Sequence, residues 1–86
     1  MEKTFQDDAW DDYIYWFQTN NKAVLKRIHA LLKDIERDPY NGIGDPEELK
    51  HDLSGCFSRR IDRENRMVYT VEESQIIIIY CRGHYI

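Results

Sequence analysis

The chain has 86 residues, enough for one domain with a small core, and its 42% hydrophobic and 33% charged residues are typical of a globular protein rather than a disordered one. The longest apolar run, Ile76 to Cys81, is too short to span a bilayer, and the N-terminus lacks the apolar stretch of a signal peptide, so we expect a cytoplasmic protein without a membrane partner. The formal net charge of -4 argues against binding of nucleic acid through the whole surface.

A short strand and a first helix are expected at the start of the chain. The strand covers Lys3 to Phe5, and Asp7 or Asp8 can then cap the helix because a carboxylate accepts hydrogen bonds from the free N–H groups of a first turn. The apolar residues that follow recur at the helical period, which predicts that they face the core: Trp10, Tyr13, Ile14 and Phe17.

A second helix is expected to begin after Asn20 or Asn21 and to end at Asp38, because Pro39 disfavours helical conformation in the residue before it. Basic residues line one face of this helix. Its other face is apolar at helical spacing and carries Val24, Ile28, Leu31, Leu32 and Ile35. Two helices in succession predict a helical hairpin.

Residues 41–46 form a loop rich in turn residues, and residues 47–50 are expected to make one helical turn. Strands are then predicted at 56–61, 66–72 and 75–81. The four isoleucines from Ile76 to Ile79 show no alternation, so both faces of the last strand should be covered, one by the helices and the other by a partner. The order βααβββ predicts an α+β fold in which the N-terminal hairpin packs on a small, mostly antiparallel sheet.

The cysteines and histidines give no spacing typical of a metal site. Cys56 and Cys81 are expected to be reduced, buried and unpaired, since neither belongs to a CxxC motif. The three histidines are scattered singly, and His29 is expected to have a structural role on the second helix. We therefore expect no metal and no other cofactor.

The second half of the chain is more basic than the first. Residues 1–48 hold eleven acidic and six basic residues, whereas residues 49–86 hold six basic and five acidic ones. The basic excess is greatest between Lys50 and Arg66, where Arg59, Arg60 and Arg63 also lie. A local basic patch on an acidic protein is typical of one focused binding site for an anion.

One carboxylate, one histidine and several cations in this half form a candidate set for chemistry: Glu47, Lys50, Arg60, Arg66, His84 and Tyr85. RNA carries its own nucleophile, the 2′-hydroxyl, so its cleavage needs only a base, an acid and cations that stabilise the charged phosphoryl group. The set therefore favours metal-independent cleavage of RNA. The alternative is that these residues form an ordinary solvated surface, with Glu47 only capping a helical turn.

Six short blocks follow one another over nearly the whole chain: WDDY at 10–13, GIGDPE at 42–47, LKHDLSG at 49–55, SRRI at 58–61, RMVY at 66–69 and HY at 84–85. Together they resemble the YoeB/Txe family of toxins. The resemblance implies a RelE-like domain over residues 1–86 that acts as a ribosome-dependent mRNA endoribonuclease, an mRNA interferase, in a toxin–antitoxin pair. The implied partners are a YefM/Phd-type antitoxin and the ribosome with its mRNA, with operator DNA reached only through the antitoxin.

The same resemblance implies roles for individual residues. Glu47 corresponds to the general base, Arg66 to the stabiliser of the phosphate, His84 to the general acid and Tyr85 to a residue that orients the substrate. Four further residues correspond to positions that bind RNA phosphates or support the catalytic side chains: Lys50, His51, Arg60 and Glu64.

Four residues depart from the family's pattern, and one of them is Glu48, which replaces the usual second proline. Asp45 stands where a basic residue is common, Gly83 stands where a bulky residue normally precedes the terminal pair, and Ile86 extends the chain beyond the usual terminal tyrosine. Glycine gives the backbone extra freedom, so we expect Gly83 to loosen the geometry around His84. These departures keep an alternative open, in which the chain retains the fold and the antitoxin interface but cleaves RNA weakly. A topoisomerase-poisoning relative of the ParE type is disfavoured because such a protein has no need of Glu47, His84 and Tyr85.

Overall fold

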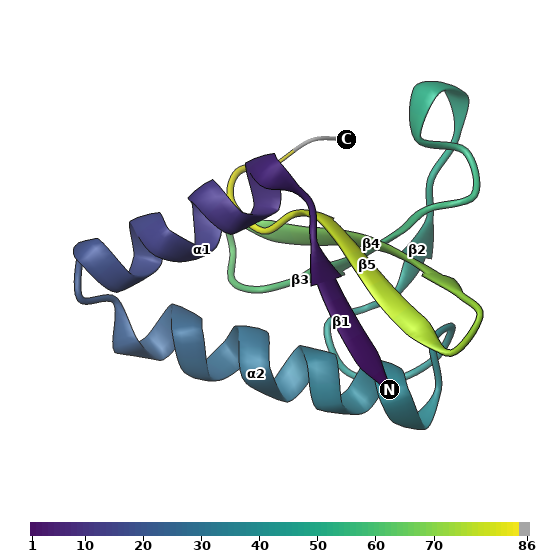
Figure 1. The fold of residues 1–86 in the computed structure, drawn as a ribbon, viewed down its shortest axis with the longest axis horizontal. Helices are drawn as coiled ribbons and strands as arrows, with labels where there is room; N and C mark the ends of the chain where they lie inside the picture. The colour runs from purple at the N-terminus through teal and green to yellow at the C-terminus, as the bar shows by residue number, and fades with distance from the viewer. Residues whose placement is uncertain (85–86) are drawn as a thin grey trace.

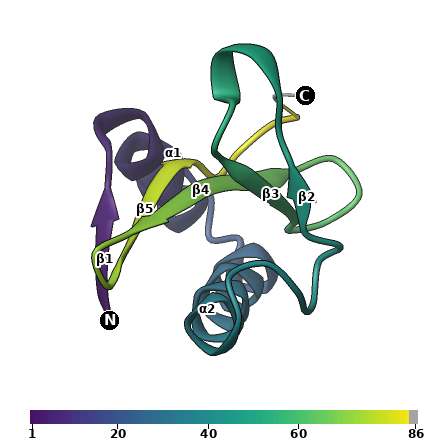
Figure 2. The ribbon, with the colours of Figure 1, turned by 90° about the vertical axis from the view of Figure 1, so that its right-hand side faces the viewer.

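A computed structural model describes residues 1–84 of the chain and shows two helices packed on one face of a five-stranded sheet (Figures 1 and 2). The elements follow one another as β1 (Glu2–Phe5), α1 (Asp7–Gln18), α2 (Lys22–Arg37), β2 (Glu47–Glu48), a 3-10 turn η1 (His51–Leu53), β3 (Phe57–Arg60), β4 (Arg66–Glu72) and β5 (Gln75–Tyr80). The strands lie in the order β1-β5-β4-β3-β2, with β1 parallel to β5 and the other three pairs antiparallel. The predicted α+β fold with a mostly antiparallel sheet is confirmed.

Helix α1 differs from its prediction in its cap and in the face that it buries. Gln6 is the N-cap residue and makes no side-chain cap, while Asp7 and Asp8 lie in the first turn, where their charges favour the helix dipole. The buried residues are Ala9 and Trp16. The expected aspartate cap is therefore wrong.

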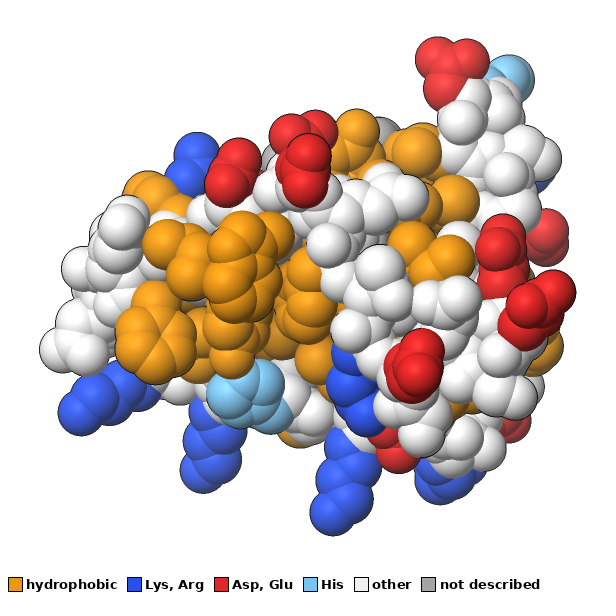
Figure 3. Space-filling model, viewed as in Figure 1, with side chains coloured by type: hydrophobic (Ala, Val, Ile, Leu, Met, Phe, Trp, Pro, Cys, Tyr) orange, Lys and Arg blue, Asp and Glu red, His pale blue; other side chains and the backbone are white. Residues whose placement is uncertain are grey.

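The aromatic stripe predicted to face the core is largely exposed, with Trp10 51% and Phe17 63% accessible. The core instead contains Ala9 and Trp16, which lie one residue, or about 100°, around the helix from the predicted stripe, and Tyr13 is the member of that stripe that packs against the core. Trp10 stacks on Tyr13 instead, with ring centroids 6.0 Å apart. Figure 3 shows the hydrophobic patch that results on this side of the molecule.

Helix α2 has the boundaries and the buried face that its sequence predicts. The Asn21 side chain caps it by accepting a hydrogen bond from the Val24 N–H at 3.2 Å. All five predicted apolar residues are buried: Val24, Ile28, Leu31, Leu32 and Ile35. His29 has the expected structural role, since its Nε2 lies 2.7 Å from the Tyr13 hydroxyl and links α2 to α1.

Strand β5 lies between β1 and β4, and its two faces are unequally covered. Ile76 and Ile78 are fully buried in the core beneath the helices, as predicted. Ile77 and Ile79 alternate with them and are half-buried on the other face, which we call the open face. Within residues 1–84, Ile77 and Ile79 therefore keep part of their surface exposed on the open face, where the isoleucine run predicts a partner.

Residues 47–50 do not form the predicted helical turn. Glu47 and Glu48 pair with Ser58 and Phe57 as the short edge strand β2, and Leu49 continues the pairing by donating to the Cys56 carbonyl at 2.9 Å. A single helical turn leaves most of its backbone groups without partners, whereas pairing with β3 satisfies them. The turn follows instead at η1, which rises above the open face (Figure 2).

Both cysteines are free, as predicted, and each lies just outside the strand in which it was expected. Cys81 is fully buried, whereas Cys56 is only half-buried. Burial raises the pKa of Cys81 to about 12. Neither helix in the described part of the chain has the length and apolar character needed to cross a membrane.

Candidate active site

A cleft of 340 Å³ on the open face brings together residues from the middle and the end of the chain. Strand pairing explains why they meet, because Glu47 lies opposite Ser58 and Arg60 lies opposite Arg66. The lining residues are Asp45, Glu47, Ser58, Arg60, Arg66 and His84. Four of these six were predicted site residues, and the fold places them around one cavity.

The charged groups of the cleft cross the sheet in a defined order. Glu47 stands on β2, Arg60 on β3 and Arg66 on β4. His84 comes next, because the Gly83 carbonyl before it accepts a hydrogen bond from the Arg66 N–H at 2.8 Å. The segments that carry the Glu47 carboxylate and the His84 imidazole therefore lie on opposite sides of the two strands that carry the guanidinium groups.

The Arg66 side chain is held in place from behind. Its Nη1 atom donates to three backbone carbonyls of the preceding turn, those of Asp62 at 2.9 Å, Asn65 at 3.2 Å and Arg63 at 3.4 Å. Guanidinium is planar, so hydrogen bonds at one nitrogen orient the whole group. This turn therefore presents Arg66 to the cleft in a fixed orientation.

Arg60 and Arg66 are directly opposed on neighbouring strands, an arrangement that is unfavourable for two like charges. Asp45 lies near them, with its Oδ2 3.8 Å from the Arg60 Nη2, but both side chains are largely exposed and such pairs contribute little. A phosphate between the two guanidinium groups would relieve the repulsion by accepting hydrogen bonds from both. The cleft thus has the electrostatics of an anion site.

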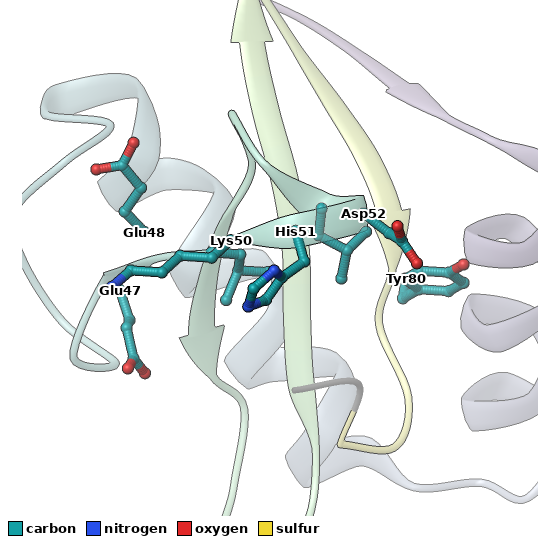
Figure 4. A pocket seen from close by; sticks show the side chains of 8 residues that line it. Glu47, Glu48, Lys50, His51, Asp52 and Tyr80 are labelled. Atoms are coloured by element: carbon teal, nitrogen blue, oxygen red, sulfur yellow. The ribbon is translucent and has the colours of Figure 1, made fainter.

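A second hollow of 680 Å³ adjoins the cleft, and Glu47 lines both (Figure 4). Lys50 and His51 line this hollow rather than the cleft that holds Arg66. Glu47 and Glu48 point in opposite directions, as successive residues of a strand do, so only one of them faces the cleft. The predicted phosphate-binding residues are therefore divided between two adjoining cavities.

Sequence reasoning did not select several residues of these cavities, among them Asp45, Ser58 and Tyr80. Simple alternation places Tyr80 on the helix side with Ile78. A β-bulge between Val68 and Tyr69 pairs Tyr80 with Val68 and turns its side chain to the open face. Nothing in the sequence marks that bulge, whereas alternation from Arg60 indicates the orientation of Ser58.

Among the described residues, Glu64 and Arg59 line neither of these two cavities. Glu64 lines a separate hollow beside Tyr15 and Arg82. Tyr85 lies beyond residue 84 and so outside the described residues. Arg59, which we counted in the basic patch, is fully buried on the helix side of the sheet.

Arg59 anchors the loop that leads to Glu47. Its guanidinium donates to the Asp34 carboxylate at 2.6 Å and to the backbone carbonyls of Asp38 at 2.7 Å and Ile43 at 3.2 Å. Its Nε donates to the Tyr69 hydroxyl at 3.0 Å. Hydrogen bonds from Arg37, the Ile43 N–H and Arg59 hold the pKa of Asp34 well below its usual range.

Chemically, the cleft offers groups that can accept a proton, donate a proton and stabilise a negative charge between them. General acid and base groups each contribute about 10²–10⁴-fold to a rate when correctly placed. No cluster of three or more His, Cys, Asp or Glu suited to a metal ion occurs among residues 1–84.

Comparisons with known proteins show the family of this chain. A family described as "YoeB-like toxin of bacterial type II toxin-antitoxin system" matches residues 5–85. Toxin YoeB of Synechocystis sp. is 53% identical over 85 residues, which cover 99% of this chain and 98% of the relative. Among solved structures, a YoeB/ParE toxin from Agrobacterium tumefaciens superposes with a TM-score of 0.93 at 39% identity, covering 99% of this chain and 100% of that one. The toxin chain of a YoeB-YefM complex from Staphylococcus aureus gives a TM-score of 0.90 at 48% identity, with coverages of 99% and 98%. Because the family match extends over nearly the whole chain, the protein belongs to the YoeB-like toxins of bacterial type II toxin-antitoxin systems.

Proposed function

We propose that this toxin is a ribosome-dependent endoribonuclease of the cytoplasm that cleaves mRNA without a metal ion. The observation that supports the proposal most strongly is the cleft shared by Glu47, Arg60, Arg66 and His84. A carboxylate and an imidazole separated by two cations are what cleavage by the 2′-hydroxyl requires. The ribosome would supply the mRNA in an extended conformation.

In this mechanism Glu47 removes the proton from the 2′-hydroxyl, which attacks the adjacent phosphorus. Arg66 and Arg60 stabilise the charge that gathers on the phosphoryl oxygens, and the carbonyls that hold Arg66 keep it from reorganising during the reaction. His84 protonates the departing 5′-oxygen. The products are a 2′,3′-cyclic phosphate and a 5′-hydroxyl end.

The remaining candidate residues have supporting roles in this proposal. Lys50 and His51 hold the neighbouring phosphate and base from the hollow that adjoins Glu47. Tyr85 orients the substrate, as the family resemblance implies. Glu64 lies beside the segment that carries His84 and would act through that segment rather than on the RNA.

We further propose that a YefM-type antitoxin binds this toxin and covers its open face. The Staphylococcus aureus relative is found in a complex with YefM. In the present chain Ile77 and Ile79 are half-buried on the open face, and burial of their remaining apolar surface would favour association. Size-exclusion chromatography of the toxin with the product of the neighbouring gene tests this, and separate elution of the two proteins at micromolar concentration would rule the partner out.

The catalytic proposal is tested in a translation extract programmed with a reporter mRNA. The wild type should produce new 5′-hydroxyl ends, and Glu47→Gln and His84→Gln should each reduce their rate of appearance by about 10²–10⁴-fold. Ile35→Val serves as the control, because it removes one buried methyl group from the core-facing side of α2 and does not touch the cleft. If the same ends appear undiminished with both variants, the assigned roles are wrong.

A second candidate function is an antitoxin-binding relative that cleaves RNA weakly. The position of Asp45 in the cleft, close to Arg60, favours it, because a carboxylate there weakens the attraction for RNA. Growth arrest on expression that requires His84 would exclude this candidate. Growth without arrest, together with antitoxin binding, would support it.

A further inference from the structure

The segment that delivers His84 to the cleft is held by α1 before it reaches the site. The Cys81 N–H donates to the Asp12 carboxylate at 3.1 Å, and the Cys81 carbonyl accepts from the Trp16 indole at 2.8 Å. Trp16 and Cys81 are both buried, so the bond between the indole and the carbonyl is shielded from water. The chain therefore leaves the core at Cys81 in a fixed direction.

Two residues later, Gly83 is held from the other side by the turn before β4. The Gly83 N–H donates to the Asn65 Oδ1 at 2.8 Å, and the Gly83 carbonyl accepts from the Arg66 N–H at 2.8 Å. Gly83 has a φ of 85°, in the left-handed region that favours glycine. The sequence predicts a loosened backbone at Gly83, whereas the structure shows both of its backbone groups bonded in a conformation that other residues rarely adopt.

The Asn65 side chain is itself oriented by Asp62. Its Nδ2 donates to the Asp62 Oδ1 at 3.0 Å and Oδ2 at 3.2 Å. The carboxylate also accepts the backbone N–H groups of Glu64 at 2.9 Å and Asn65 at 2.8 Å, which closes the turn. Because the amide nitrogen of Asn65 donates to the carboxylate, its side-chain oxygen, the one acceptor of the side chain, is turned toward Gly83.

The same turn holds a second group of the cleft. The carbonyls of Asp62 and Asn65 are among the three that orient the Arg66 guanidinium. The turn at residues 62–65 thus contacts Arg66 through backbone carbonyls, and it contacts Gly83, the residue before His84, through the Asn65 side chain. The distance between Arg66 and His84 depends on this turn.

We propose that Asn65, oriented by Asp62, is a positioning residue that holds Gly83 and thereby places His84 against Arg66. The proposal rests on the proposed nuclease function, in which His84 is the general acid. His84 is one peptide bond from the clamped residue, so release of Gly83 frees the imidazole to leave the cleft. Proton transfer depends on distances of a few tenths of an ångström, whereas Asn65 contacts Arg66 through its backbone carbonyl, which a substitution of the Asn65 side chain retains.

The test measures single-turnover cleavage of mRNA on programmed ribosomes at increasing toxin concentration. Asn65→Ala should lower the maximal rate by roughly tenfold or more and leave the half-saturating toxin concentration within about twofold. In a His84→Gln background the same substitution should change the rate by less than about twofold, because the group that Asn65 positions is then absent. A loss of similar size in both backgrounds would overturn the proposal.

An exchanged pair provides the matched control. In the double variant Asp62→Asn/Asn65→Asp, the donor and the acceptor trade places, the new carboxylate still accepts from the Gly83 N–H, and the net charge is unchanged. This variant should recover most of the wild-type rate, whereas Asn65→Ala should not. Failure of the exchanged pair to recover activity while it remains folded would contradict the proposed clamp.

A readout independent of activity separates this proposal from the nuclease function. Amide hydrogen exchange at Gly83 should be slower in the wild type and in the exchanged pair than in an unstructured peptide. In Asn65→Ala it should be at least about tenfold faster than in the wild type. If exchange responds in this way but the wild type does not cleave mRNA, the nuclease function is wrong and the positioning role fails with it, while the clamp stands. Unchanged exchange in Asn65→Ala would overturn the clamp itself.

Discussion

The buried arginine beneath the cleft offers a test of how the site loop is held. Asp34 bonds two arginines, the fully buried Arg59 and the exposed Arg37, whose side chain is 61% accessible. We therefore compare Arg59→Met with Arg37→Met. The substitution and the carboxylate partner are the same in the two variants, whereas the two arginines differ in their burial and in the further partners that they hold.

The expected magnitude follows from the groups that each substitution leaves behind. Without Arg59, the carbonyls of Asp38 and Ile43 lose their donor and the Asp34 carboxylate loses a bond of 2.6 Å. Breaking a buried charged network in this way costs about 3–5 kcal/mol, a large part of the roughly 4–13 kcal/mol expected for a domain of this size. Arg37→Met leaves groups that water can reach, so its effect on stability should be small.

Urea unfolding followed by tryptophan fluorescence measures the difference, since buried Trp16 reports on the core. Arg59→Met should lower the urea midpoint strongly, whereas Arg37→Met should leave it nearly unchanged. Amide exchange at Arg60, whose N–H donates to the Gly44 carbonyl at 2.7 Å, should quicken only in Arg59→Met. A cost below about 1 kcal/mol for Arg59→Met, or equal midpoints for the two variants, would refute the view that Arg59 anchors the loop before Glu47.

Three further predictions concern the same loop and the cysteines. Because hydrogen bonds lower the pKa of Asp34 in the folded state, its contribution to stability is present above about pH 4 and is lost as the pH falls below that; acid titration of Asp34→Asn should show a flatter decline. Gly42→Ala should lower the melting temperature by several degrees, since a Cβ there overlaps the Asp34 carboxylate and the φ of 141° is unsuited to alanine; an unchanged melting temperature would contradict the loop geometry. At pH 8 iodoacetamide should modify Cys56 first, because burial raises the pKa of Cys81 to about 12; equal rates in the folded protein, measured by mass spectrometry, would show that Cys81 is not sealed in the core.

The sequence predicts some elements of this fold better than others, for physical reasons. Helix α2 follows its sequence closely because one apolar face meets one sheet, so its period and its cap both point to the same arrangement. Helix α1 is apolar around much of its circumference, with aromatic residues on two faces, and periodicity alone cannot decide which face the sheet covers. Strand β2 has only two residues, so its pairing with β3 leaves no periodic pattern to detect.

The candidate site follows the same distinction. Sequence reasoning selects Glu47, Arg60, Arg66 and His84 by chemistry and resemblance, and the sheet register brings them together. It includes Arg59 wrongly, because adjacent residues of a strand point to opposite faces and only one of two neighbouring arginines can line the cleft. It also predicts a loose backbone at Gly83, which the structure does not show. Asn65 restrains Gly83 from 18 positions earlier in the chain, and the two residues meet only in the folded protein.

The central claim is that the 2′-hydroxyl of the bound RNA attacks the adjacent phosphorus, while Glu47 removes a proton and His84 donates one. The most direct test is single-turnover cleavage of a synthetic mRNA on programmed ribosomes, first with ribose throughout to map the cut site, and then with one 2′-deoxy nucleotide placed immediately 5′ of that cut. The all-ribose mRNA should be cut to leave a 2′,3′-cyclic phosphate and a 5′-hydroxyl, and the single 2′-deoxy substitution should abolish cleavage at that site. Cleavage of the 2′-deoxy mRNA at a comparable rate, or products with 5′-phosphate ends, would contradict the mechanism.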